Sequence, residues 1–128
     1  MANLNRVQLI GRLGRDPETR FTPKGSKICQ FSVAVDHRWR GADGEMKERT
    51  NWFNIEAWGR LGEVCHEYLK KGSLIFLEGR LKTDKYEEKG ETRYFTKVVA
   101  QSLEFLDKRP AEEPMLVVEE DPGEYGVE

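Results

Sequence analysis

The chain of 128 residues has little of what disulfide scaffolds, metal centres and membrane proteins require. Its two cysteines, Cys29 and Cys65, form no CxxC pair and no disulfide framework. Its two histidines, His37 and His66, have no cysteine or carboxylate partners at a metal-ligand spacing. No apolar run reaches the roughly 20 residues that span a bilayer, and residues 1–14 lack the apolar stretch of a signal peptide. We therefore expect a cytoplasmic, single-domain protein that is not an enzyme and uses no metal or cofactor.

The charge of the chain divides near Arg109. The net charge is −2, but all 21 lysines and arginines lie at or before Arg109, together with only 16 of the 23 acidic residues. Residues 1–109 therefore carry +5 and residues 110–128 carry −7. We interpret residues 1–109 as a folded basic domain and residues 110–128, with their prolines and glycines, as an acidic disordered tail, unless the apolar run Met115–Val118 docks.

The stretch Thr50–Gly59 is predicted to be a strand with two different faces. Side chains alternate across a strand, so the odd positions from Phe53 to Ala57 share an apolar core face. The opposite face places Trp52 and Trp58 beside an amide and a carboxylate, which a core tolerates only when they are hydrogen-bonded. About 20 Å of extended chain separates the two indoles, so this face suits a row of unpaired bases better than one small ligand. Alternatively, the indoles cover the edge of the core or lie in a subunit interface.

Strand and helix patterns recur along the rest of the basic domain. Apolar residues recur at helical spacing over Leu61–Leu69, and Gly72 is suited to end that helix. A polar, mobile loop is expected over Arg40–Arg49, and a hairpin turn over Glu87–Glu91. The predicted strands are Arg6–Leu13, Lys27–Trp39, Thr50–Gly59, Ile75–Tyr86 and Thr92–Leu106, with a short extra strand at Thr19–Thr22.

Five strands with one helix between the third and fourth give the order of an OB-fold, a mainly all-β, five-stranded Greek-key barrel. Such barrels bind oligonucleotides across one face, but they also bind other partners, so the fold does not settle the function. Gly11, in the first strand, is expected where a barrel strand bends or lets another backbone approach.

Alternation conflicts with an exposed position for Trp39. The odd positions from Cys29 to Val35 face inward, and the same parity turns Trp39 inward too. Either the alternation slips near His37 or the strand leaves the core there.

Six basic side chains near the aromatic strands are candidates for contacts with nucleic-acid phosphates. Any one of them is explained equally well as ordinary charged surface, but as a group beside aromatic residues they favour a phosphate partner. Tyr86, on the outer face of its strand, adds a further aromatic residue. The six candidates are Arg6, Arg12, Arg20, Lys71, Lys82 and Lys85.

Several separated motifs resemble those of the bacterial-type single-stranded DNA-binding protein family. The resemblance covers Leu4 to Leu106 and implies an OB-fold that binds single-stranded DNA without sequence specificity, assembles as a homotetramer and catalyses nothing. The motifs are Asn5–Val7 with Leu9–Glu18, Gly44–Glu48, Glu67–Ser73 and Glu78–Leu81. Positions that stack bases in that family match Trp39, Trp52, Trp58 and Tyr86. The resemblance thus favours Trp39 as a stacking residue despite its parity.

A homotetramer would also explain three apolar residues on predicted outer faces. Ile10, Leu74 and Phe76 all point outward by parity, and contact between copies would cover them.

The end of the chain departs from the family pattern. Members finish on an acidic stretch and a Pro-Phe tip that recruits replication and repair enzymes, whereas here Glu119–Pro122 is followed by Glu124–Glu128 without that tip. We expect such recruitment to be weak, and a cytoplasmic, nucleoid-associated role in DNA replication, recombination and repair. Two alternatives are a replication-restart accessory protein of the same fold and a module whose aromatic face binds a protein partner.

Overall fold

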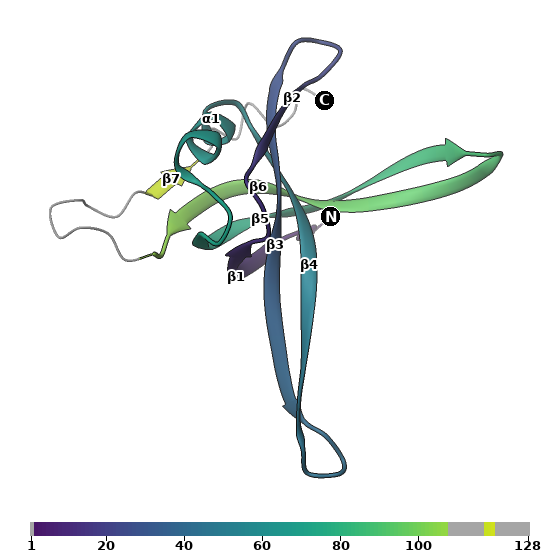
Figure 1. Ribbon diagram of the computed structural model, residues 1–128. Coiled ribbons are helices and arrows are strands. Elements are labelled where there is room, and N and C mark those ends of the chain that lie inside the picture. Colours follow the sequence, from purple (N-terminus) through teal and green to yellow (C-terminus); the bar gives the residue numbers. More distant parts are fainter. Residues whose placement is uncertain (1, 108–116, 120–128) are drawn as a thin grey trace, which may run out of the picture.

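Five long strands close into a barrel in the computed structural model, which describes residues 2–107 and 117–119. The order around the barrel is β1 (Val7–Leu13), β5 (Leu74–Glu88), β6 (Glu91–Phe105), β4 (Met46–Trp58) and β3 (Lys27–Arg40) (Figure 1). β3 pairs with β1 to close the ring, and four of the five contacts are antiparallel, while β4 runs parallel to β6. Helix α1 (Gly59–Tyr68) connects β4 to β5. This arrangement confirms the predicted OB-fold, with its helix between the third and fourth barrel strands.

The core lies inside the barrel and is built by the inward faces that alternation predicts. Val33, Ile55 and Leu77 are fully or almost fully buried there, and α1 covers the core with Leu61 and Cys65. Burial raises the pKa of the Cys65 thiol, so this cysteine packs as a small apolar residue.

Glycine permits the closest strand contact in the barrel. A Cβ atom at Gly11 would collide with the backbone carbonyl oxygen of Ala34, so β1 and β3 approach here only because Gly11 has no side chain. The structure thereby confirms the expected close approach of a second backbone at this position.

Two short strands extend the sheet beyond the barrel. β2 (Glu18–Phe21) pairs with the start of β3, as expected for the short extra strand. β7 (Val117–Glu119) pairs with β6 at Ser102–Glu104, so Val117 and Val118 dock on the sheet, which is the exception that the sequence left open. The rest of the predicted tail lies outside the described residues.

Two hairpins run past the end of the barrel as arms that point in different directions (Figure 1). We call residues 36–50 the β3–β4 arm and residues 82–97 the β5–β6 arm. Pairing between β3 and β4 continues without interruption to Arg40 and Met46, so the mobile loop expected over Arg40–Arg49 is wrong; only residues 41–45 join the strands. The unbroken register also shows that the alternation does not slip near His37: the strand leaves the core.

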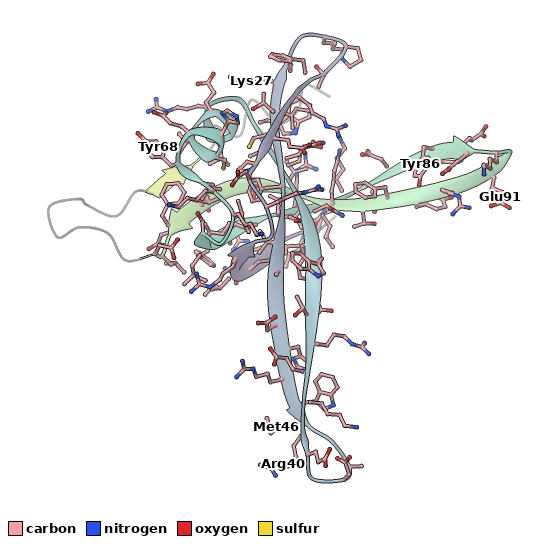
Figure 2. All side chains as sticks on the ribbon, viewed as in Figure 1. Lys27, Arg40, Met46, Tyr68, Tyr86 and Glu91 are labelled. Atoms are coloured by element: carbon pink, nitrogen blue, oxygen red, sulfur yellow. The ribbon has the colours of Figure 1, made fainter. Side chains whose placement is uncertain are left out.

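The β5–β6 arm ends in a two-residue turn. Lys89 and Gly90 have φ angles of 52° and 80°, the left-handed pair that a type I′ hairpin turn requires. Figure 2 shows Tyr86 near the free end of this arm, with side chains projecting from the arm on several sides.

No helix within the described ranges is long and apolar enough to cross a membrane.

Candidate nucleic-acid interface

The side chains that point away from the barrel interior form one continuous surface across four strands, which we call the outer face. Residues directly opposite each other in a ladder share a face, so Trp52 lies with Ala34, and Asn54 lies with Ser32. On β5 and β6 the same side carries residues such as Lys82 and Tyr86. The even positions of Thr50–Gly59 therefore do form a face separate from the core.

Trp52 is the most exposed indole on the outer face. Its side chain is 59 % exposed, and its six-membered ring lies against Gly14, where a Cβ atom would collide with the ring. The absence of a side chain at Gly14 thus leaves room for the ring on the sheet surface. A flat, exposed indole in a fixed place is a stacking surface for a base, and each stacked base contributes about 1–3 kcal/mol.

Trp58, by contrast, is buried, at 8 % exposed. It packs with Ile28 and Val99, and its Nε1–H donates a hydrogen bond of 2.6 Å to Oε1 of Glu56. For Trp58 the structure therefore supports the alternative that the indole covers the edge of the core, and not an open position for a base. Because β6 runs beside β4, it brings Val99 and Lys97 over the outer face and supplies the cover that the sequence pattern alone does not show.

A buried carboxylate holds the base of the β5–β6 arm. Glu56 is 2 % exposed, and its Oε2 accepts a hydrogen bond of 2.6 Å from Nζ of Lys97, which also contacts Oδ2 of Asp84 at 2.9 Å. Burial by itself would lower the pKa of Lys97, but the hydrogen bonds to Glu56 and Asp84 outweigh it and raise that pKa. The hydrogen bond from Lys97 also lowers the pKa of Asp84. Lys97 thus joins β4 to the β5–β6 arm through its contacts with Glu56 and Asp84.

Trp39 lies on the opposite face of the same ribbon from Trp52. It faces Lys47 across the ladder, at odd positions, whereas Trp52 and Ala34 occupy even positions. Trp39 is 36 % exposed and stacks on His37, with ring centroids 5.3 Å apart and ring planes 20° from parallel. His37 and Trp39 line a shallow hollow on this face, together with Arg49 and Asn51. The β3–β4 ribbon therefore presents aromatic surfaces on both of its faces.

The β5–β6 arm carries two exposed aromatic residues on the outer face. Tyr86 is 45 % exposed, opposite Arg93, and Phe95 is 44 % exposed, opposite Asp84 and nearer the barrel. Phe95 is absent from the sequence-based candidates. Its alternation with Arg93 and Lys97 in the sequence could have indicated an exposed face.

The six basic candidates do not gather in one place. Arg20 and Lys82 lie on the side of the exposed aromatic residues, whereas Lys85 pairs with Tyr94 on the other side of the arm. Nε of Arg6 is 3.1 Å from Oε2 of Glu78 on β5.

The remaining two lie near the C-terminal end of α1. Arg12 donates a hydrogen bond of 2.9 Å to the Gly72 carbonyl oxygen and lies 3.5 Å from Asp107, so it holds this end of the fold together. Lys71 follows α1, where its backbone N–H donates to Oδ1 of Asp16 at 2.8 Å.

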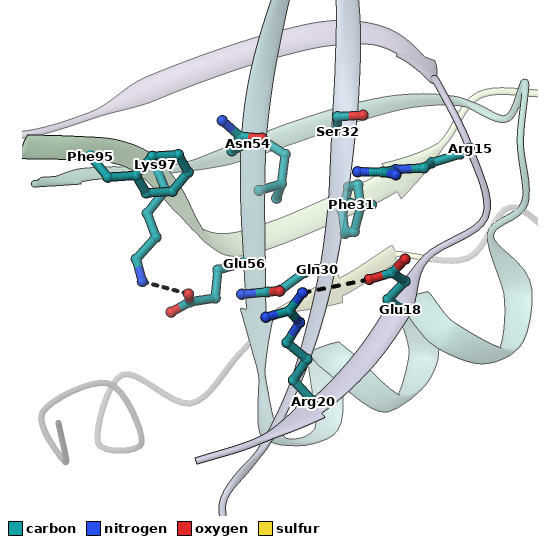
Figure 3. Close-up of a pocket in the computed structure, with 11 residues that line it drawn as sticks. Arg15, Glu18, Arg20, Gln30, Phe31, Ser32, Asn54, Glu56, Phe95 and Lys97 are labelled. Carbon is teal, nitrogen blue, oxygen red and sulfur yellow. Dashed lines mark hydrogen bonds and ion pairs between the residues drawn. The ribbon is translucent and has the colours of Figure 1, made fainter. Parts of the chain in front are cut away.

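A polar groove of about 130 Å³ lies between β2, β3, β4 and β6 (Figure 3). Arg15 and Arg20 border it on one side, and Phe95 and Lys97 border it on the other. Between them, β3 and β4 contribute Gln30, Phe31, Ser32, Asn54, Ile55 and Glu56, and Glu18 of β2 lies beside Arg20. Within the described part of the chain, no cluster of histidine, cysteine or acidic residues is arranged to hold a metal ion.

The closed five-stranded barrel places the chain among the OB-fold proteins, a class with many kinds of ligand. The sequence model of the single-strand binding protein family matches residues 4–106, and the chain belongs to that family. Proteins of this family bind DNA and are not enzymes, which agrees with the absence of catalysis expected from the sequence.

Similar proteins carry corresponding names. Single-stranded DNA-binding proteins from two strains of Neisseria meningitidis are each 46 % identical over 108 residues, which is 84 % of this chain and 62 % of theirs. Single-stranded DNA-binding protein 1 of Chlorobaculum tepidum is 40 % identical over 105 residues, 80 % of this chain and 65 % of that protein. The chain thus spans less than two thirds of the length of these relatives.

Two solved structures share the fold. A Plasmodium falciparum SSB in complex with ssDNA has a TM-score of 0.76 and 29 % identity, covering 84 % of this chain and 98 % of the other. A deletion mutant of the single-stranded DNA-binding protein from Thermus aquaticus has a TM-score of 0.73 and 34 % identity, covering 83 % of this chain and 52 % of the other.

Proposed function

We propose that this chain binds and protects single-stranded DNA, largely independently of sequence, during DNA replication, recombination and repair. The observation that carries the proposal is the set of exposed aromatic side chains along the two ribbons: Trp52, Tyr86 and Phe95 on the outer face and Trp39 on the opposite face. Family membership and the similar proteins support the same ligand.

The mechanism is passive and consumes no nucleotide. The excess positive charge of residues 1–109 draws the strand in at long range, and base stacking on Trp52 and its neighbours holds it at close range. Paired bases have no free face to stack, so the protein prefers unpaired strands. Because Trp39 and Trp52 lie on opposite faces of one ribbon, a strand that uses both must cross an edge of the β3–β4 ribbon.

Tryptophan fluorescence tests the proposal. Oligo-dT should quench the emission of Trp52 and Trp39, while the buried Trp58 should respond little, because no base reaches its ring. The Trp52→Phe and Trp39→Phe variants assign the quenched signal, and a duplex of the same length serves as the control ligand. Equal quenching by duplex and single strand, or none by either, would reject the proposal and favour an aromatic face that binds a protein partner.

We also propose a homotetramer. Ile10 is 56 % exposed on β1, opposite the half-buried Phe76 of β5. Among the described strands, residues 7–10 of β1 pair only with β5, which leaves their other edge open to a second copy of β1. Light scattering should give four times the chain mass of 14.9 kDa. A mass of one chain at every concentration would overturn this assembly without affecting the DNA-binding test.

The expected weak recruitment of replication and repair proteins by the acidic residues 110–128, which lack the family's Pro-Phe tip, stays a prediction, as does a nucleoid-associated, cytoplasmic location. Apart from β7, these residues lie outside those that the structure describes.

A further inference from the structure

We propose that the polar groove receives one unpaired base of the bound strand and that the side-chain amides of Gln30 and Asn54 read its hydrogen-bonding edge. This inference rests on the proposed function and deepens it, because it adds a base preference at one position to binding that is otherwise independent of sequence.

The register of β3 and β4 places the polar groups together. Gln30 lies directly opposite Glu56, and Ser32 lies directly opposite Asn54, so the four side chains form adjacent cross-strand pairs on the outer face. Figure 3 shows Gln30 and Asn54 between Phe95, on β6, and Arg20, on β2. The two central strands therefore contribute polar side chains to the groove above the buried Phe31 and Ile55, and Phe95 adds an aromatic ring at one border.

The fold uses the side chain of Glu56, whereas it leaves the two amides unused. Glu56 accepts hydrogen bonds from Trp58 and Lys97, both at 2.6 Å, so it is held in place. In contrast, the amides of Gln30 and Asn54 have no hydrogen-bond partner among residues 2–107 and 117–119. Each amide carries a donor and an acceptor side by side, the arrangement that pairs with the edge of a base. Their hydrogen bonds are thus available to a ligand.

The groove also lies next to a stacking surface. Asn54 follows Trp52 by two residues on the same face, a separation of about 7 Å along the strand. A base beyond the one stacked on Trp52 therefore reaches the groove and meets Phe95, which is 44 % exposed. Arg15 and Arg20 supply cationic donors for the phosphates that flank it.

The inference predicts a kind of selectivity that stacking does not provide. Every base has a face that stacks, so stacking alone is tolerant of sequence. An amide pair that forms hydrogen bonds with one base leaves its donors and acceptors unpaired with another, and a good bidentate pair discriminates by about 1–3 kcal/mol. One base edge should consequently be preferred, and Gln30 and Asn54 should set the preference.

The test compares affinities for dT, dA and dC homopolymers of equal length and for an abasic strand of the same backbone. We expect the ratio between the best and the worst homopolymer to fall by about fivefold or more in the Gln30→Leu/Asn54→Leu variant, the change equivalent to 1 kcal/mol. Affinity for the abasic strand should stay within about twofold, because it has no base edge to read. Asn54→Asp, which keeps the shape but removes the donors, should change the base that is preferred.

Two variants separate this inference from general effects on binding. Asn51→Leu makes the same chemical change on the opposite face of β4 and should leave the homopolymer ratios unchanged, whatever it does to affinity. Trp52→Ala should weaken binding to all homopolymers alike. Ratios that are equal in the wild type and the double variant would overturn the inference while leaving the proposed function intact. Failure of the wild type to bind any single strand would instead reject the proposed function.

Discussion

The barrel and the two arms are built from the same strands, but the barrel buries one face of each strand and the arms leave both faces exposed. Within the barrel, β3 buries Cys29, Phe31 and Val33 in alternation, whereas every residue from Asp36 to Arg40 is exposed. The alternation itself continues into the arm, but no opposite wall faces it there. Side chains with the same parity as the core thus become exposed, and an aromatic residue in an arm keeps its ring surface for a ligand.

The largest effect is expected at the joint between barrel and arm. Lys97→Met should lower the free energy of unfolding by about 3–5 kcal/mol, because Glu56 is left buried without its charged partner. Chemical denaturation measures this change. Lys85→Met, at an exposed position of the same arm, is the matched control and should change the stability by less than about 0.5 kcal/mol. Similar losses of stability in both variants would mean that the contacts of Lys97 with Glu56 and Asp84 do not specifically hold the arm to the barrel.

Trp52→Ala should separate stability from binding. The loss of one stacking surface should weaken binding of single-stranded DNA by about 1–3 kcal/mol. In the barrel, Leu77→Ala should instead lower the free energy of unfolding by about 2–5 kcal/mol while leaving the affinity of the folded protein unchanged. Fluorescence titration and denaturation on both variants give the four values. If the Trp52 variant lost stability but no affinity, the indole would support the fold and would not bind DNA.

A smaller effect should follow acidification. The pKa of Asp84 is lowered in the folded protein, so its carboxylate stabilises the fold above its usual pKa of 3.8, and this contribution is lost as the pH falls through the lower folded value. Lys97, whose pKa is raised above 10.5, loses its contribution only as the pH rises through the folded value. The free energy of unfolding, measured from pH 7 to pH 2, should fall less steeply for Asp84→Asn than for the wild type. If the free energy of unfolding fell equally steeply with pH in both proteins, the ionised Asp84 would not stabilise the fold.

The smallest expected effect concerns the charge of the β5–β6 arm. If Lys82 neutralises one phosphate, Lys82→Ala should reduce the slope of log affinity against log salt by about 0.7, with little change at high salt. Titrations at several salt concentrations measure the slope, and Trp52→Ala, which removes no charge, should keep it. An unchanged slope for Lys82→Ala would mean that Lys82 does not contact a phosphate of the bound strand.

Local pattern was sufficient for much of the fold. Alternation and helical spacing placed the five barrel strands and α1, because those faces must turn apolar side chains toward one interior. The length of the β3–β4 arm was not predictable in this way, since its polar residues suit an exposed strand as well as a loop. For Phe95, alternation with Arg93 and Lys97 indicates an exposed face, but the sequence does not show whether Phe95 or its neighbour Tyr94 shares a face with Tyr86. The pairing of β6 with β5 decides this in favour of Phe95.

What the sequence determined by itself is therefore the set of local faces: a core face through Ile55, an aromatic and polar face through Trp52, and a basic body. Tertiary structure decided how each face is used. β6, some 40 residues further along the chain, covers Glu56 and Trp58 with Lys97 and Val99 and leaves Trp52 open. The physical reason is that alternation depends on neighbours in the chain, whereas burial and ion pairing depend on which distant strand lies alongside.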